Sequence, residues 1–462
     1  MNQPLHPLID WLYGLRGPDL KWELETARRF SSALGHPERR YPCVHVAGTN
    51  GKGSVAAMVA AVAREAGLRC GLFTSPHLVS PTERIRIDGT PLPLDRFLAR
   101  ISDLRGKAAR ALAGGMLDRH PSFFEMMTAA ALVEFAEQKV DLAVLEVGLG
   151  GRLDATNIVV PGVSVVTTIG LDHRRTLGGS LPAIAREKAG VIKPGVPVVL
   201  GPLPGAARAV VELAAREAAA PLYRAPEDVR VSGAGPDGRV TFTSPEARYG
   251  PLRLGLEGAH QVRNAQVAVR AVELLRARAG LPIPPAAVSG GLSAVRWPGR
   301  LERLAGRPPV VLDAAHNLDG IAALARHLSR RDAAAGARPR RVLVFGLTEG
   351  RDPGAMLAPL AGLVDAVVVA PPATSRAIEP ERVAAEGRRL GLDTRSAPNA
   401  AVALEAARAL AGPNGEILGA GSLYLVGDLR RELLGLEGPG HARAERVPPV
   451  SGPPARRRAR TR

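Results

Sequence analysis

Three observations on the sequence predict an α/β protein of two domains. The chain has 462 residues, which is more than a single hydrophobic core usually organises. Short apolar segments alternate with helix-forming segments through more than half of the chain, a pattern typical of helices packed on a sheet. A stiff, proline-rich break at residues 281–285 separates this region from a second, shorter pattern of the same kind.

The first region predicts a mostly parallel sheet with helices on both faces. Its strand-like segments are short, apolar on both sides and followed by glycine or polar loops, as in sheets that are buried on both faces. We expect strands at residues 41–47, 69–73, 141–147, 163–169 and 196–200. We expect helices at residues 55–66, 125–138 and 260–279, and a small antiparallel segment between residues 221 and 256.

The second region predicts a smaller, Rossmann-like α/β domain. Its expected strands are the apolar segments at residues 309–313, 341–345, 366–370 and 416–419. The predicted boundaries are therefore 1–295 for the first domain and 296–436 for the second. Residues 437–462 are rich in arginine and proline and lack hydrophobic periodicity, so we expect a disordered tail.

A glycine-rich run between a predicted strand and a predicted helix is the most informative local feature. It reads Gly48, Thr49, Asn50, Gly51, Lys52, Gly53 and Ser54. Glycines in such a turn let backbone N–H groups converge on a phosphate at the N-terminus of a helix. Lys52 is placed to reach the outer phosphates of a nucleotide and Ser54 to bind a metal ion, although Gly53 separates them, unlike in the common G-x-x-x-x-G-K-[ST] pattern. The first domain is therefore predicted to be of the phosphate-loop ATPase type.

Two further polar residues follow predicted strands and indicate a metal site. Glu146 ends one strand and His173 follows another, and the carboxyl ends of parallel strands share one edge of a sheet. A carboxylate beside a phosphate loop suits Mg²⁺, which prefers oxygen ligands and nucleotide phosphates. Alone, Glu146 has even odds of being a solvated loop residue, and a lone histidine is more often structural. Together with Ser54 on one edge they favour magnesium, and a second cation there could shield both a phosphate and a carboxylate.

Four other residues are ambiguous by spacing alone. Lys188 is more readily interpreted as a surface lysine at the end of a helix. Asp313 and His316 belong to a strand-end turn of a common type, although a carboxylate there also suits a ribose hydroxyl and a histidine suits phosphate. Arg300 precedes that turn and could reach a transferring phosphate across a cleft.

Composition and charge exclude several classes of protein. Apolar residues make up 46% of the chain, enough for packed cores, and no apolar run is suited to span a membrane. Cys43 and Cys70 are expected to be buried free thiols. The net charge of +17 suits anionic substrates, and no aromatic residue interleaves the arginines of the tail, so we expect neither nucleic acid nor membrane as partner. The N-terminus lacks a signal-peptide pattern, which predicts a cytoplasmic protein.

The motifs taken together resemble those of a known family. They are Val46-Ala-Gly-Thr-Asn-Gly-Lys-Gly-Ser54, Ser75-Pro-His-Leu78, Glu83-Arg-Ile-Arg86, Leu145-Glu-Val-Gly-Leu-Gly-Gly-Arg-Leu-Asp-Ala-Thr-Asn157, Asp172-His173, Arg186-Glu-Lys-Ala-Gly190, His260-Gln-Val-Arg-Asn264, Pro298-Gly-Arg300, Asp313-Ala-Ala-His-Asn317 and Gly421-Ser-Leu-Tyr424. From about residue 10 to residue 430 the chain resembles the folylpolyglutamate synthase/dihydrofolate synthase family of the Mur ligase superfamily.

The resemblance implies a ligase that uses ATP and Mg²⁺ to join L-glutamate to a carboxylate of dihydropteroate, of a (tetrahydro)folyl-polyglutamate, or of both. In that family this is acid–amino-acid ligase chemistry (EC 6.3.2), which proceeds through an acyl phosphate and serves folate biosynthesis, polyglutamylation and one-carbon metabolism. The residues leave open whether this chain has one activity or both. The resemblance further implies two magnesium ions, room for a monovalent cation, and a monomer whose partners are its small-molecule substrates.

The resemblance also assigns roles to individual residues. Those that match metal ligands are Ser54, Glu146, His173 and Lys188, with Lys188 as the lysine that the family can carbamylate. Those that match nucleotide contacts, besides the loop from Gly48 to Ser54, are Asn264, Arg300, Asp313 and His316. Those that match catalytic positions are Lys52, Lys188, His173 and Arg300. The implied folate pocket includes Ser75, Pro76, His77, Arg84, Phe124, Arg152 and Asp154.

Two rival functions fit the same phosphate loop less well. A Mur-type ligase acting on a cell-wall precursor needs a UDP-sugar domain before the loop, but only 47 residues precede Gly48. A nucleotide switch that signals through a partner does not need a second α/β domain carrying Arg300 and Asp313. We therefore favour the folate ligase.

Overall fold

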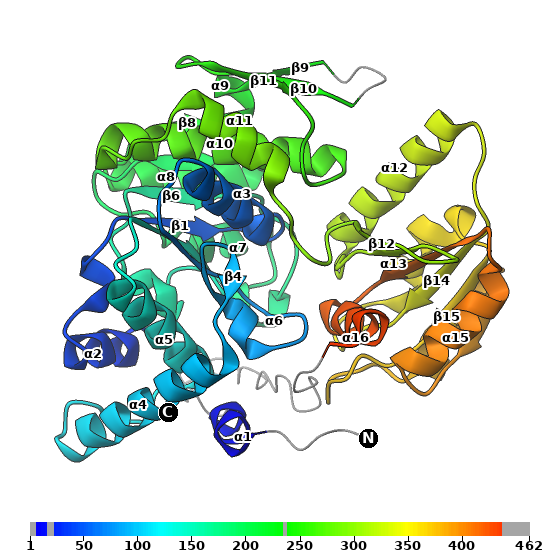
Figure 1. Ribbon diagram of the computed structural model, residues 1–462, viewed down its shortest axis with the longest axis horizontal. Helices are drawn as coiled ribbons and strands as arrows, with labels where there is room; N and C mark the ends of the chain where they lie inside the picture. The colour runs from blue at the N-terminus through cyan, green and yellow to red at the C-terminus, as the bar shows by residue number, and fades with distance from the viewer. Residues whose placement is uncertain (1–5, 16–22, 234–237, 437–462) are drawn as a thin grey trace, which may run out of the picture.

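The computed structural model describes residues 6–15, 23–233 and 238–436, which form two lobes side by side (Figure 1). The first lobe, up to residue 294, is built on an eight-stranded sheet and a small three-stranded sheet; the second, from residue 302, is built on a six-stranded sheet. Residues 295–301 are the linker between them. Both large sheets carry helices on two faces, which confirms the predicted α/β class. The predicted tail, 437–462, lies outside the described residues.

The eight-stranded sheet is parallel except at one edge. Its order is β4-β3-β2-β5-β1-β6-β7-β8, and β3 runs antiparallel to both of its neighbours. The strands are β1 (Cys43–Ala47), β2 (Cys70–Phe73), β3 (Ile85–Ile87), β4 (Thr90–Pro91), β5 (Leu142–Glu146), β6 (Val163–Val166), β7 (Val198–Leu200) and β8 (Leu222–Arg224). Because β1 lies between β5 and β6, the loops that leave these three parallel strands come together at one edge of the sheet.

Alternating side chains along the strands of this sheet face two different helix layers. Val44 and Val46 of β1 belong to the core with α3 (Lys52–Glu65), α10 (Ala259–Ala279) and α11 (Pro285–Ala294). Cys43 instead packs in the layer of α1 (Pro7–Gly14), α4 (Leu94–Ala113) and α5 (Phe123–Glu137). The helices of this lobe are α1 (Pro7–Gly14), α2 (Glu25–Ala33), α3 (Lys52–Glu65), α4 (Leu94–Ala113), α5 (Phe123–Glu137), α6 (Arg174–Leu177), α7 (Leu181–Ala189), α8 (Gly205–Glu217), α9 (Ala225–Asp228), α10 (Ala259–Ala279) and α11 (Pro285–Ala294). Short 3₁₀ turns lie at Pro37–Arg39, Pro81–Arg84 and Ala155–Ile158.

The antiparallel segment predicted between residues 221 and 256 is the three-stranded sheet of the first lobe, except that residues 222–224 form β8, which runs parallel to β7 in the large sheet. Its order is β11-β10-β9, with β9 (Arg230–Ser232), β10 (Val240–Thr243) and β11 (Arg248–Leu252). Phe242 and Tyr249 are buried in the same core as α10 and α11. The Tyr249 hydroxyl donates a hydrogen bond of 2.7 Å to Glu273 of α10, so its buried polar end is satisfied.

The six-stranded sheet of the second lobe is also parallel except at one edge. Its order is β12-β13-β17-β14-β15-β16, with β12 antiparallel to β13. The strands are β12 (Glu302–Leu304), β13 (Val310–Leu312), β14 (Arg341–Phe345), β15 (Ala366–Val369), β16 (Asp393–Ser396) and β17 (Glu416–Ala420). One face packs on α12 (Leu318–Ala335), α13 (Pro353–Leu357), the 3₁₀ helix Ala358–Leu363 and α14 (Pro380–Arg389), and the other on α15 (Ala400–Ala411) and α16 (Leu423–Leu434).

The expected strands are all present, although several end earlier than predicted. The strand expected at residues 163–169, for example, ends at Val166. The helix expected from residue 55 already begins at Lys52, because Gly51 adopts a positive φ of 87° and the chain turns helical inside the loop. Strands β3, β4, β8, β12 and β16, at or next to the sheet edges, were not predicted. Within the described ranges no helix is both long and apolar enough to cross a membrane.

Candidate active site

Two glycines shape the loop between β1 and α3. Gly48 has a φ of 149°, and a Cβ there would lie 1.9 Å from Thr167 Oγ1. Gly51 has a φ of 87°, and a Cβ there would lie 2.5 Å from the side-chain oxygen of Asn264. A side chain at either position would be strained and would displace its neighbour. The loop therefore turns tightly into the N-terminus of α3.

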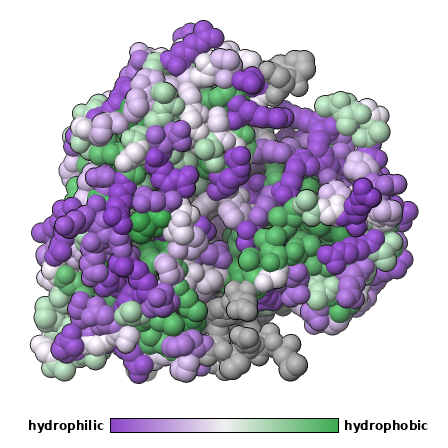
Figure 2. All heavy atoms as spheres, viewed as in Figure 1, coloured by the Kyte–Doolittle hydropathy of each residue, from purple (hydrophilic) through white to green (hydrophobic). Residues whose placement is uncertain are grey.

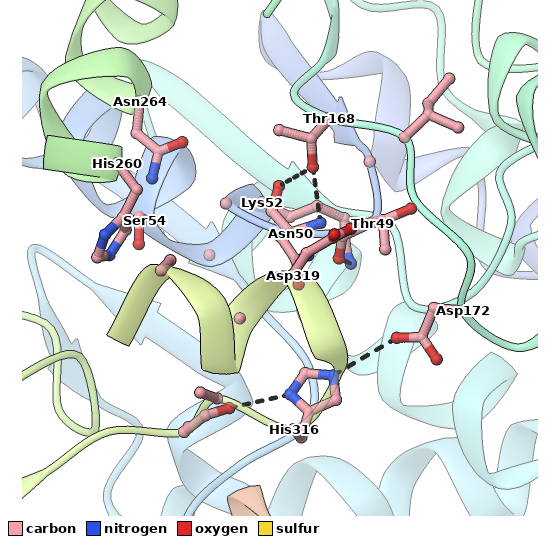
Figure 3. Close-up of a pocket in the computed structure, with 18 of the residues that line it drawn as sticks. Thr49, Asn50, Lys52, Ser54, Thr168, Asp172, His260, Asn264, His316 and Asp319 are labelled. Carbon is pink, nitrogen blue, oxygen red and sulfur yellow. Dashed lines mark hydrogen bonds and ion pairs between the residues drawn. The ribbon is translucent and has the colours of Figure 1, made fainter. Parts of the chain in front are cut away.

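The residues that follow β6 hold this loop in place. The N–H of Thr49 donates to the backbone oxygen of Thr168 at 2.7 Å, and the N–H of Asn50 donates to Thr168 Oγ1 at 3.0 Å. The hydroxyls of Thr167 and Thr168 both donate to the backbone oxygen of Asn50, at 2.7 and 3.0 Å. Figure 3 shows the contact between Thr168 and Asn50. The protein itself thus fixes the loop conformation.

A cavity of about 430 Å³ lies between the two lobes, with this loop as one wall. Figure 2 shows the surface hollowed between the lobes. The first lobe contributes the loop, the residues after β5 and β6, and the start of α10, and the second contributes residues 313–316 and α12. The predicted residues that line it are Gly48, Thr49, Asn50, Gly51, Lys52, Gly53, Ser54, Ser75, Pro76, Glu146, His173, Lys188, Asn264, Arg300, Asp313 and His316. One cavity therefore collects every predicted metal, nucleotide and catalytic residue.

Glu146 stands at the end of β5, beside the start of α3. Its carboxylate oxygens lie 3.6 and 3.7 Å from the position that a Cβ would take at Gly53, the residue before Ser54. The N–H of Ser75 donates to Glu146 Oε2 at 3.1 Å. Burial raises the pKa of Glu146, while the charge of Lys52 and the hydrogen bond from Ser75 oppose this. The Glu146 carboxylate thus lies beside the N-terminus of α3, a place where phosphates bind, and Ser54 of that helix lines the same cavity.

Lys188 is buried at the end of α7 and reaches the phosphate loop. Its ammonium group donates to the backbone oxygen of Gly48 at 2.7 Å, so the interpretation of a surface lysine is wrong. Burial and the nearby charge of Lys52 lower its pKa to about 7. His173 also lines the cavity, and burial lowers its pKa to about 4. Above pH 7 both side chains favour the neutral form, in which nitrogen can act as a ligand or nucleophile.

Asp172 joins the two lobes at the cavity. Its carboxylate accepts hydrogen bonds from Asn317 Nδ2 at 3.0 Å and Arg351 at 2.7 Å. His316 Nε2 lies 3.7 Å from the carboxylate, and the dashed line between His316 and Asp172 in Figure 3 marks this contact. Burial alone would raise the pKa of Asp172, but the interaction with His316 and the surrounding positive charge hold it well below its usual range. Asn317 also exchanges two side-chain hydrogen bonds with Asn50, at 2.9 and 3.3 Å, so the second lobe contacts the phosphate loop directly.

The predicted nucleotide contacts lie on both sides of the cavity. Asn264 of α10 stands beside Gly51 and donates to Gln261 at 2.9 Å, which fixes its amide orientation. Figure 3 shows Asn264 on the same side of the cavity as Ser54. Arg300 of the linker donates to the backbone oxygen of its neighbour at 3.0 Å and lines the cavity. A nucleotide in this cavity therefore has donors available from both lobes.

Asp313 and His316 shape the turn that leads into α12. The Asp313 carboxylate accepts from the N–H groups of Leu301 and Ala315, at 3.0 and 2.9 Å. His316 Nδ1 lies 2.9 Å from the backbone oxygen of Ala314. Burial raises the pKa of Asp313, and the charge of Arg300 opposes this. Asp313 and His316 thus both stabilise the turn at the end of β13 and line the cavity.

The residues predicted for the folate pocket divide into two groups. Ser75 and Pro76 line the main cavity, and His77 lines a smaller cavity of about 40 Å³ that adjoins it. The residues that line neither cavity are Arg84, Phe124, Arg152 and Asp154.

Each member of the second group has a protein partner instead. Arg84 is buried and donates to His77 Nδ1 at 2.8 Å, and Arg152 forms an ion pair of 2.9 Å with Glu187. Phe124 packs 5.9 Å from Phe73, measured between ring centroids. The Asp154 carboxylate accepts from the Thr156 hydroxyl at 2.5 Å and from the N–H of Leu149 at 2.9 Å. Arg84, Phe124 and Asp154 stand next to residues that line a cavity, namely His77, Gly148 and Leu149. The side chain of Arg152 is half exposed.

Several residues of the site were not predicted. Asp172 and Asn317 stood in recognised motifs, but only their cross-lobe contacts reveal a role. Thr167 and Thr168 lie in a segment that was expected to be a strand, and nothing in the sequence indicated that their hydroxyls hold the phosphate loop. Arg351 lies 179 positions from its partner Asp172, and no local pattern connects two residues so far apart in the chain.

The fold and the cavity define a Mur-type ligase. Residues 46–272 match the Mur ligase middle domain, and residues 299–423 match the Mur ligase glutamate ligase domain. The first match contains the phosphate loop and Glu146, and the second contains Arg300 and the Asp313 turn.

Individual relatives identify the branch. Dihydrofolate synthase/folylpolyglutamate synthase of Bacillus subtilis is 38% identical over 330 residues, covering 70% of this chain and 75% of the relative. Folylpolyglutamate synthase of Lacticaseibacillus casei is 36% identical over 409 residues, covering 87% of this chain and 92% of the relative. The chain belongs to the folylpolyglutamate synthase/dihydrofolate synthase family.

Solved structures show the same fold. Mycobacterium tuberculosis folylpolyglutamate synthase complexed with ADP has a TM-score of 0.84 at 34% identity and covers 93% of this chain and 98% of that chain. Escherichia coli FolC in complex with DHPP and ADP has a TM-score of 0.82 at 30% identity, and the match covers 94% of this chain and 99% of that chain.

Proposed function

We propose that this chain is an ATP-dependent ligase that joins L-glutamate to a carboxylate of dihydropteroate or of a reduced folate. The observation that carries the proposal is the single cavity in which the phosphate loop, Glu146 and Arg300 come together. The family supports the substrate class, since its members are named dihydrofolate synthase and folylpolyglutamate synthase. Relatives solved with ADP support the use of ATP.

The proposed chemistry needs positive charge between two anions. A carboxylate is a poor acyl donor, so transfer of the γ-phosphoryl group of ATP first gives an acyl phosphate. The amine of glutamate then attacks, the amide bond forms and inorganic phosphate leaves. Lys52 on the loop and Arg300 on the linker both line the cavity, and their charge counters the repulsion between phosphate and carboxylate as these approach.

The cavity fits Mg²⁺ as an ion that is shared with the nucleotide. Among the described residues no three His, Cys, Asp or Glu side chains are grouped so as to hold a metal. An ion here therefore needs phosphate oxygens and water, as Mg²⁺ usually has. Ser54 and Glu146 flank Gly53 and would hold one ion; His173 and Lys188 would hold the second. When bound, these ions neutralise the charge of the phosphates.

Lys188 is suited to carbamylation. A neutral amine can attack carbon dioxide and release a proton, and a pKa of about 7 makes the neutral form abundant near neutral pH. The product carbamate is an anion, which would supply oxygen ligands to the second magnesium ion. Its buried position beside Gly48 shields the carbamate from solvent.

We also propose domain boundaries at 1–295 and 296–436. Support comes from the family match that begins at residue 299 and from the linker between α11 and β12. A cytoplasmic location, a monomeric state and a bound monovalent cation stay predictions. Size-exclusion chromatography with light scattering tests the second of these.

Phosphate release tests the proposed function. With ATP, Mg²⁺ and L-glutamate, we expect release that depends on 7,8-dihydropteroate or on tetrahydrofolate, and the acid that supports it tells which product is made. Lys52→Ala should abolish release because the outer phosphates lose their counter-charge, whereas Lys107→Ala, at a partly exposed position on α4, should not. Absence of release with both acids would refute the proposal.

A further inference from the structure

A small second cavity adjoins the main one where β3 meets the linker between the lobes. Its volume is about 40 Å³, room for a single small group. Its walls are the start of α3, residues 74–78 after β2, β3, and linker residues 297–300. The residues that it shares with the main cavity are Gly53, Ser75, Pro76, Glu146, Arg300 and Leu423. A group bound here lies next to the place where the phosphates are proposed to bind.

Arg86 of β3 places a positive charge in the wall of this small cavity. The proposed reaction has so far given this charge no role. Its guanidinium stacks on Trp297 of the linker, with 5.2 Å between Cζ and the ring centroid. One terminal N–H donates to the backbone oxygen of Gly89 at 3.3 Å. Its Nε is buried without a hydrogen-bond partner among the described residues. A buried, unsatisfied donor on a cation is costly, and because Arg86 lines the small cavity, an anionic ligand there would offset the charge of its guanidinium.

The other charged groups in the wall leave room for an anion. Glu83 is already engaged, because it accepts from three successive backbone N–H groups, those of residues 78–80, at 2.8 to 3.0 Å. Glu146 accepts from Ser75 and faces the start of α3, where magnesium is proposed to bind. Within the described residues, the Arg300 guanidinium donates to the backbone oxygen of Gly299 at 3.0 Å and forms no ion pair. The small cavity thus has two arginines in its wall, and neither is paired with a carboxylate of that wall.

We propose that Arg86, together with Arg300, binds a carboxylate of an acid substrate in this small cavity. This inference rests on the proposed ligase function. The planar guanidinium can bind both oxygens of a carboxylate, and stacking on Trp297 fixes the plane of the guanidinium. The carboxylate has two possible sources in the reaction, the acid that is activated and L-glutamate. Both present the same chemical group, so kinetics with each substrate must distinguish them.

Three variants test the subsite. Arg86→Gln removes the charge, and Arg86→Lys keeps the charge without the planar fork. Arg105→Gln is the matched control, because Arg105 also stacks on an indole, with 4.7 Å to the ring centroid of Trp11, but lines neither cavity. We expect Arg86→Gln to raise the KM of one carboxylate substrate at least tenfold, as loss of a charge-assisted hydrogen bond predicts. The KM of ATP should stay within about twofold, Arg86→Lys should be intermediate, and the control should change nothing.

The pattern of KM values decides the outcome. A rise for dihydropteroate or tetrahydrofolate identifies the activated acid as the occupant, and a rise for L-glutamate identifies the amino acid. Unchanged KM values for both acids would overturn the subsite. An equal rise in the KM of the acid, of L-glutamate and of ATP, together with a lower melting temperature, would also overturn the subsite. That pattern would mark a structural role for Arg86.

Calorimetry separates the subsite from the proposed function. Each acid is titrated into the wild type and into Arg86→Gln in the presence of ADP and Mg²⁺, so that no turnover is needed. If the wild type binds an acid through Arg86 but releases no phosphate from ATP, the subsite stands and the ligase function fails. If the wild type binds neither acid, the subsite is refuted as well.

Discussion

At the scale of single residues, burial sets the protonation states in the cavity. Burial lowers the pKa of Lys188 to about 7 and that of His173 to about 4. Asp172, by contrast, stays ionised because His316 and the surrounding positive charge outweigh its burial. Above pH 7, Lys188 and His173 therefore both favour the neutral form near a carboxylate that is already engaged with the second lobe. The nitrogens of Lys188 and His173 are thus available as ligands or nucleophiles, while the Asp172 carboxylate holds the contact between the lobes.

Replacing Lys188 by methionine should make stability less dependent on pH. The native pKa of about 7 lies below the ordinary value of 10.5, so between these values the unfolded chain binds more protons and wild-type stability rises with pH. Relative to Lys188→Met, the wild type should gain about 1.4 kcal/mol of unfolding free energy per pH unit above pH 7. Urea unfolding in bicarbonate-free buffer at several pH values measures this. A difference that does not change with pH would contradict the lowered pKa.

At the scale of elements, the start of α12 couples the second lobe to the phosphate loop. Asn317 caps this helix by accepting from the N–H of Gly320 at 2.9 Å. The same side chain contacts Asn50 of the loop and Asp172 after β6. An N-cap side chain accepts a hydrogen bond from an N–H group in the first turn of its own helix. Here one amide links the position of α12 to that of the loop.

Asn317→Ala should therefore weaken ATP binding beyond the loss of a helix cap. Asn399→Ala is the matched control, since Asn399 caps α15 in the same lobe by accepting from Val402 at 3.0 Å. Each variant should lose about 1 kcal/mol of stability from its cap. Only Asn317→Ala should raise the Kd of ATP, by about tenfold, because three hydrogen bonds across the lobes are lost, two with Asn50 and one to Asp172. Equal ATP affinities in the two variants, measured by calorimetry, would show that the lobe contact does not serve nucleotide binding.

The sequence predicted those elements that are marked by a pattern of neighbouring residues, such as an apolar run or a set of glycines. The interior strands β1 and β14 are fully buried and mostly apolar, and the phosphate loop is marked by its glycines and Lys52. Edge strand β8 is only half-buried along its length and so lacks an apolar pattern. The burial of Lys188 depends on how α7 docks beside Gly48, and spacing along the chain cannot show this. The same holds for Asp172 and Arg351, which meet only once both lobes are folded and in contact.

At the scale of the whole molecule, two lobes share one site (Figure 1). They also meet away from the cavity, where Glu257 of the first lobe forms an ion pair of 3.0 Å with Arg303 of the second. The proposed acyl phosphate would form between the lobes, where residues from both sides reduce the access of water. Separation of the lobes is then needed to admit substrates and release products.

The most direct test of the proposed reaction follows one oxygen atom. The acid that supports turnover is prepared with ¹⁸O at both oxygens of its reacting carboxylate, and the released phosphate is examined by ³¹P NMR. Phosphoryl transfer to that carboxylate, followed by attack of the glutamate amine, leaves one carboxylate oxygen in the phosphate. An acyl-phosphate mechanism therefore predicts one ¹⁸O in each phosphate released with product. Unlabelled phosphate in a reaction that still forms the amide would contradict it.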